Sequence, residues 1–145
     1  MATPTNVLVL KDKVQRYLNE AIGAVEVDRD GDFTFPFGSS RIFIRCSAVG
    51  ESSVVHLTML LLNDVTPTPE LYKYVATEGG YTFGHLTVAE QEGRATVFYT
   101  HALLGDHLDP QELLAAVGAM VNTGDDLDNR LQAMFGGRLF HEQPA

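Results

Sequence analysis

Histidines, one cysteine and a run of aspartates are the side chains of this 145-residue chain that could support catalysis or metal binding. The histidines are His56, His85, His101, His107 and His141. No two are three or four residues apart, as a helical zinc pair would be, and no cysteine pair accompanies them. We therefore predict no metal site and no cofactor. His85 and His101 could meet across paired strands beside Tyr99, so a small-molecule sensor or enzyme pocket is the alternative to a binding protein.

The carboxylates of residues 28–32, Asp-Arg-Asp-Gly-Asp, invite a calcium interpretation. A calcium-binding EF-hand loop has glycine at its sixth position and Glu at its twelfth. Here Gly31 is fourth and the twelfth residue is Ser39, so the pattern favours a hairpin turn. Cys46 has no flanking nucleophile motif and no second cysteine to form an internal disulfide, which is compatible with a cytoplasmic protein. The chain carries no catalytic motif, and we predict that it is not an enzyme.

The charge balance limits the partners. With 19 acidic and 10 basic residues the net charge is −9, which argues against nucleic acid and against an anionic membrane surface. The apolar run at residues 52–65 is shorter than the roughly 20 residues that span a bilayer. A partner polypeptide is the expected ligand.

Hydrophobic periodicity and turn residues predict the elements that position these side chains. Helices are predicted at residues 7–21, 69–78 and 110–135, and strands at 33–37, 41–49, 52–65, 81–90 and 94–104, with a short strand candidate at 24–27. Asp109 is the expected cap of the last helix, with Glu112 three residues later. The predicted fold is α+β: helix, three strands, helix, two strands, helix. One antiparallel sheet of about five strands is packed by the N- and C-terminal helices.

Other local signals give finer predictions. Thr5 or Asn6 is expected to cap the first helix, and a bulge at Gly84 would explain the shift of alternation within residues 81–90. Gly118 and Gly124 could allow a second helix to approach the last one. Residues 106–128 hold six acids and no Lys or Arg, which indicates a solvated acidic face more than a site for a cation or basic partner.

Aromatic and basic side chains on the first strands are the candidate binding residues. Phe33, Phe35 and Phe37 share one face of a strand that Pro36 places at an edge. Core packing is the ordinary explanation for three such rings, and a peptide-binding face is the functional one. Arg41 and Arg45 share a face of the next strand and could bind an acidic group, although pairing with nearby carboxylates explains them as well.

Several segments together resemble a known family. They are residues 27–33, the apolar strand that ends at Asn63, the Phe83-Gly84 strand entry, residues 94–106, and the last helix from residue 125 to its end at 135–137. The chain resembles the type III secretion chaperone-like fold and, in detail, the YbjN family of bacterial proteins. Gly124-Asp125 stands where those proteins usually have Ala-Asp. The resemblance implies one domain over residues 5–138. Residues 139–145 are predicted to be a flexible tail, because chain ends are often poorly ordered. The resemblance also implies chaperone-like peptide or protein binding, often as a dimer, without catalytic residues.

The strand at residues 52–65 is apolar on both faces, and three helices are expected to cover only one face of the sheet. Because monomers seldom expose so large an apolar face, we predict a homodimer. The predicted interface residues are Leu60, Leu62, Leu71, Tyr72 and Val75.

Overall fold

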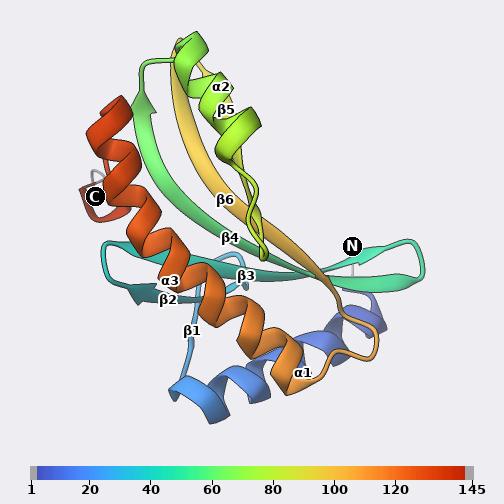
Figure 1. Cartoon of the computed structure of the whole chain (residues 1–145). Coiled ribbons are helices and arrows are strands. Elements are labelled where there is room, and N and C mark those ends of the chain that lie inside the picture. Colours follow the sequence, from blue (N-terminus) through green and yellow to red (C-terminus); the bar gives the residue numbers. More distant parts are fainter. Residues whose placement is uncertain (1–2, 143–145) are drawn as a thin grey trace.

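A twisted antiparallel sheet of six strands forms the centre of the protein in a computed structural model that describes residues 3–142 (Figure 1). The strands are β1 Glu26–Val27, β2 Phe33–Phe37, β3 Ser40–Val49, β4 Ser52–Val65, β5 His85–Gln91 and β6 Arg94–Leu104. The helices are α1 Thr5–Ile22, α2 Pro69–Glu78, α3 Pro110–Phe135 and the single 3₁₀ turn η1 Phe140–Glu142. The strand order is β1-β2-β3-β4-β6-β5, so α2 carries the chain past β6 to the far edge. The α+β prediction is confirmed, and β1 is the sixth strand.

The helices pack on one face of the sheet, which we call the covered face. α3 runs diagonally across the sheet and α1 lies beside the N-terminal half of α3 (Figure 1). α2 packs on β5 and reaches the end of α3 through an edge-on contact of Tyr74 with Phe135, 5.6 Å between ring centres. The covered face carries fully buried side chains from the three central strands: Ile42, Ile44, Leu57, Met59, Val97 and Tyr99. Most of the hydrophobic core therefore lies between this face and the helices.

Helix boundaries follow their local signals with one exception. Asp109 accepts a hydrogen bond from the Glu112 amide, as predicted, and the Thr68 hydroxyl caps α2 in the same way. The predicted cap of α1 at Thr5 or Asn6 is wrong. α1 begins at Thr5, and the extended residue before it is Pro4, which has no side-chain oxygen to offer the first turn.

The prediction for residues 81–90 needs correction. β5 begins only at His85, because the Tyr81 amide donates to the Gly84 carbonyl and closes a turn there. Gly84 has φ +95°, and a Cβ at this position would lie 2.7 Å from the Tyr99 ring. Close approach to the ring and a left-handed backbone explain this glycine, and no bulge is needed.

The irregularity that disturbs strand alternation lies instead in β4. Leu60 pairs with Phe98 and Leu62 pairs with Val97, so the register shifts between them. The shift turns Leu62 to the same covered side as Leu61, and both are fully buried. Leu60 and Leu62 therefore lie on opposite faces, although strict alternation predicted one face.

Gly124 makes a close contact, but not with a helix. A Cβ on Gly124 would lie 2.6 Å from the sulfur of Met59, so the glycine admits a side chain of β4 under α3. Gly118 faces open space. The predicted approach of a second helix at these glycines is wrong, because α3 packs directly on the sheet.

Candidate functional site

The face of the sheet away from the three α-helices carries a hollow. We call it the open face, and its central side chains are Phe43, Arg45, Ser47, His56, Thr58, Leu60 and Phe98. The hollow has a volume of about 650 Å³. Its lining is Asp28, Asp30, Asp32, Phe43, Arg45, Ser47, His56, Thr58, Leu60, Phe98 and Phe140. β3, β4 and β6 form its floor, while the turn after β1 and the one-turn helix η1 form its sides.

The floor of the hollow carries three large apolar side chains beside its polar ones. Phe43, Leu60 and Phe98 are half-buried, unlike their fully buried neighbours on the covered face. Phe140 of η1 packs edge-on against Phe43, with 5.9 Å between ring centres and 61° between planes. This geometry is favourable for two aromatic rings and leaves part of the floor uncovered.

One side of the hollow is acidic. The Asp28 carboxylate accepts hydrogen bonds from the amides of Asp30 and Asp32, both at 2.9 Å, and this fixes the turn predicted for residues 28–32. Asp32 receives both Nε and an Nη of Arg45, at 2.9 and 2.8 Å. The hydrogen bond and charge of Asp32, with smaller effects of Asp30 and Asp28, raise the pKa of Arg45. The lining has three carboxylates against one guanidinium, so it is negative.

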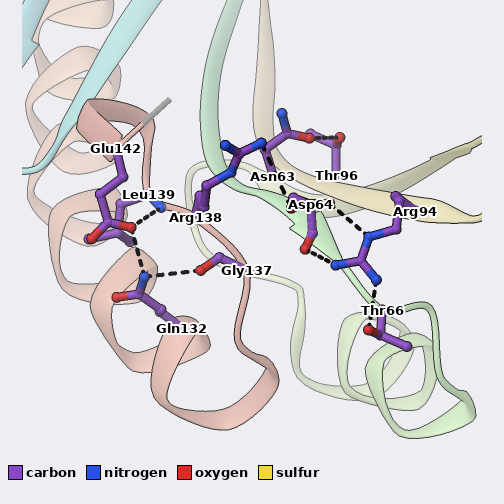
Figure 2. Close-up of polar contacts among 10 residues, drawn as sticks. All are labelled: Asn63, Asp64, Thr66, Arg94, Thr96, Gln132, Gly137, Arg138, Leu139 and Glu142. Atoms are coloured by element: carbon purple, nitrogen blue, oxygen red, sulfur yellow. Dashed lines mark hydrogen bonds and ion pairs between the residues drawn. The ribbon is translucent and has the colours of Figure 1, made fainter. Parts of the chain in front are cut away.

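A polar network brings the C-terminal segment to this face. Arg138 pairs with Asn63 of β4 through two backbone hydrogen bonds of 2.8 Å (Figure 2). Gln132 donates to the Gly137 carbonyl and to the Glu142 carboxylate (Figure 2). The chain thus crosses the end of β4 after α3 and delivers Phe140 to the hollow. Of the predicted tail, residues 139–142 take part in this arrangement and residues 143–145 lie outside the described part of the chain.

The same end of β4 is tied to β6 by Arg94. Its guanidinium donates to the Asp64 carboxylate at 2.7 Å, to the Asp64 carbonyl at 2.6 Å and to the Thr66 hydroxyl at 2.9 Å (Figure 2). The hydrogen bond and charge of Arg94 lower the pKa of Asp64. These contacts fix the exit of β4 toward α2.

The five predicted peptide-binding residues fall on two faces. Phe33, Phe35 and Phe37 share one face as expected, but they lie opposite Ile44, Ile42 and Ser40 on the covered side, and Phe33 is only 4% exposed. Arg41 and Arg45 belong to the open face. Arg41 pairs with Glu26 at 2.7 Å and Arg45 with Asp32, which confirms that carboxylates partner both.

The five predicted dimer residues also separate. Leu62 and Leu71 are fully buried in the core. Leu60 is half-buried in the hollow, Val75 is half-buried on α2, and Tyr72 of α2 is 37% exposed. Three residues of the predicted set therefore have accessible surface that a dimer could bury, namely Tyr72, Val75 and Leu60.

The residues of the small-molecule alternative lie at the other end of β6. His85 and His101 line a small hollow of about 230 Å³, and the His101 ring packs edge-on against Phe83. Burial, with a smaller effect of His85, lowers the pKa of His101. Tyr99 is buried and its hydroxyl donates to the Phe83 carbonyl. Within residues 3–142, no group of three or more His, Cys, Asp or Glu side chains is placed to hold a metal ion.

Cys46 lies on the covered face of β3 and is buried. Burial raises its pKa to about 11, so the thiol stays protonated at neutral pH. A protonated, buried thiol is a poor nucleophile.

Sequence reasoning missed the aromatic residues of the hollow, namely Phe43, Phe98 and Phe140, and favoured a hairpin turn for Asp28 and Asp30. A signal for two of them was present. Phe43 stands between Arg41 and Arg45, and Phe98 stands between Thr96 and Thr100, on the less apolar faces of their strands. Nothing local indicated Phe140, whose place depends on the pairing of Arg138 with Asn63.

Comparison with known proteins now identifies the class of protein. Residues 9–143 match the family TY-Chap1, described as T3SS (YopN, CesT) and YbjN peptide-binding chaperone 1. The match covers most of the chain, so the chain belongs to this family of peptide-binding chaperones. The resemblance to the YbjN and type III secretion chaperone proteins is confirmed.

A solved structure agrees on the fold. The type III secretion chaperone SycH of Yersinia pestis, in complex with a stable fragment of YscM2, superposes with a TM-score of 0.53 and 11% sequence identity. The superposition covers 81% of this chain and 98% of that chain. No curated protein sequence matches the chain. None of the helices in the described residues is long and apolar enough to cross a membrane.

Proposed function

We propose that this protein is a non-enzymatic, chaperone-like module that escorts or regulates a partner polypeptide, and that it binds an extended segment of that partner on the open face. The observation that carries the proposal is the hollow over Phe43, Leu60 and Phe98, which offers these half-buried apolar side chains beside polar and acidic ones. Membership in a peptide-binding chaperone family supports the same function, and SycH was crystallised with a fragment of another protein.

The geometry suits an extended peptide. Half-buried side chains in line on neighbouring strands can accept alternate side chains of a strand-like segment. Of the predicted contact residues, Arg45 lines the hollow and Arg41 lies on the same face, so these two stay in the proposal. Phe33, Phe35 and Phe37 would support the face from the covered side.

Site-specific cross-linking tests this proposal. Benzoylphenylalanine in place of Phe98, expressed in the native host, should cross-link a polypeptide that mass spectrometry identifies. The matched control has the same group in place of Leu8, an α1 residue 53% exposed and away from the open face. Cross-links of equal yield at both positions, or none at Phe98, would contradict the proposal.

We also propose a homodimer formed through α2. Tyr72 and Val75 are its exposed and half-buried apolar side chains, and a two-fold contact would bury both. Light scattering at high micromolar concentration should give twice the monomer mass, and Tyr72→Asp should give the monomer mass. Leu8→Asp is the control, because it adds the same charge on α1. A monomeric unsubstituted protein would end this proposal.

The cytoplasm is the proposed location, because a single buried thiol with no disulfide partner suits a reducing compartment. The small-molecule alternative near His85 and His101 has less support. Its hollow of about 230 Å³ is smaller than the roughly 300–1,000 Å³ typical of ligand pockets, and Tyr99 does not line it.

A further inference from the structure

We propose that the hollow selects a segment of the partner that carries an aromatic side chain flanked by Lys or Arg. The inference rests on the proposed function, because it names the chemistry of the peptide that the open face would bind. It follows from two properties of the hollow that lie side by side, the partly covered aromatic floor and the acidic wall.

An aromatic ring from the side of the hollow already covers part of the floor. Phe140 packs edge-on against Phe43, while Leu60 and Phe98 line the rest of the floor. A hollow of about 650 Å³ exceeds the volume of one side chain, so it has room for a further ring over the neighbouring side chains of Leu60 and Phe98. Aromatic rings gain from edge-on contact beyond the area that they bury, which favours a partner ring over an aliphatic side chain.

The acidic wall, formed by Asp28, Asp30 and Asp32, carries more negative charge than Arg45 neutralises. Arg45 is committed to Asp32 through a two-point ion pair. Asp28 and Asp30 make no ion pair with any Lys or Arg within residues 3–142. Lys11 of α1 approaches the turn at Gly31 without forming one. A Lys or Arg of the bound segment, next to its aromatic ring, would form an ion pair with Asp28 or Asp30.

The charge also distinguishes a foreign peptide from a second copy of the chain. Each copy has a net charge of −9, so a second copy laid over the hollow would oppose like charges. A basic segment gains from the same field. A dimer through α2 would leave the wall free to act on a peptide.

Peptide binding to the full chain tests the inference. The probe is a fluorescein-labelled peptide, Gly-Ser-Lys-Ser-Phe-Ser-Lys-Ser-Gly, followed by fluorescence anisotropy at low ionic strength. One comparison peptide has Glu at both Lys positions, and another has Ala at the Phe position. We expect the basic aromatic peptide to bind at least about tenfold more tightly than the Glu peptide, and this ratio to shrink as salt is added. The Ala peptide should bind more weakly at every salt concentration.

Matched variants assign the effect to the hollow. Asp30→Asn should reduce the preference for Lys over Glu, because it removes one carboxylate of the wall without removing the amide bonds to Asp28. Asp12→Asn, at an exposed position of α1, removes the same charge elsewhere and should leave the preference unchanged. Phe98→Ala should weaken the basic aromatic peptide toward the Ala peptide, and circular dichroism checks that the variant is folded.

The possible failures are distinguishable. Equal affinity for the Lys and Glu peptides would overturn this inference while the cross-linking at Phe98 could still support peptide binding. An equal loss of preference in Asp30→Asn and Asp12→Asn would also overturn it, because net charge alone would then explain the effect. If none of the peptides binds, or if the cross-linker at Phe98 captures only a second copy of the chain, the inference fails. Absence of any cross-link at Phe98 would contradict the proposed function itself.

Discussion

The two faces of strand β4 differ in how deeply their side chains are buried. Leu57 and Leu60 lie three residues apart on β4, yet Leu57 is completely buried under the helices and Leu60 lies in an open hollow. Both are leucines in the same strand with partners on both sides. The helices therefore divide one apolar strand into a face that stabilises the fold and a face that is available for binding.

Aspartate side chains also have different roles on the two faces of the sheet. On the covered side the buried Asp128 accepts the Ser39 hydroxyl at 2.6 Å and joins α3 to the turn between β2 and β3. On the open side Asp28 and Asp32 shape and border the hollow. The predicted solvated acidic face on residues 106–128 is thus wrong for Asp128, which is 0% exposed.

The largest expected effect separates the two faces directly. Leu57→Ala should lower the free energy of unfolding by about 3 kcal/mol, because it leaves a cavity in the packed core. Leu60→Ala should cost about 1 kcal/mol or less, because its side chain is only half-buried. Urea denaturation followed by circular dichroism measures both. Equal losses would mean that the open face is as much a part of the core as the covered face.

Gly124 offers a second contrast, within the covered layer. Gly124→Ala should cost about 1–3 kcal/mol, because the new methyl group would lie 2.6 Å from the Met59 sulfur and displace the end of this fully buried side chain. Gly118→Ala, on the same helix but facing open space, should gain up to about 1 kcal/mol from helix propensity. Denaturation midpoints measure both changes. A stabilising Gly124→Ala would show that the Met59 side chain has room to move aside.

Much of the fold could be predicted because its signals are local. The cap at Asp109, the Pro at the start of α2 and the polar turns set most element boundaries within a residue or two. The errors arose where distant parts meet. The turn before β5 depends on room for Tyr99, and the burial of Asp128 depends on Ser39, which is 89 residues away.

The candidate site was harder to predict than the fold for the same reason. Arg45 and its carboxylate partner come from neighbouring strands and were within reach of pattern reasoning. The hollow combines β3, β4, β6 and η1, and Phe140 reaches it because Arg138 pairs with Asn63. The shift of register that buries Leu62 likewise follows from pairing with β6, which alternation along β4 does not contain.

A smaller effect concerns the protonation of Asp128. Burial raises the pKa of this carboxyl above its ordinary value near 3.8, against the lowering effect of the Ser39 hydrogen bond. A raised pKa in the folded state means that the carboxyl favours folding at low pH and loses that contribution as the pH rises through the folded pKa. Relative to the natural protein, Asp128→Asn should therefore gain stability between pH 4 and pH 7.

Urea denaturation across this pH range measures the difference between the two proteins. Asp126→Asn is the control, because Asp126 is exposed and pairs with Arg130 one turn away. Its difference from the natural protein should change little with pH over the same range. A difference for Asp128→Asn that is flat with pH would show that Asp128 titrates as a solvated carboxyl.

The smallest expected effect concerns Asp106, which contacts the start of β4 and whose pKa is shifted in the opposite direction to that of Asp128. Asp106 accepts hydrogen bonds from the Ser53 amide at 3.1 Å and hydroxyl at 2.9 Å, and these bonds lower its pKa below the ordinary value near 3.8. A lowered pKa gives a contribution that is present above the ordinary value and is lost as the pH falls through the folded pKa. The natural protein should therefore lose more stability than Asp106→Asn as the pH falls from about 5 to below 3. Glu90→Gln, at an exposed position of β5, is the control and should lose as much as the natural protein. Identical acid profiles for Asp106→Asn and the natural protein would show that the Ser53 bonds do not depend on the charge of Asp106.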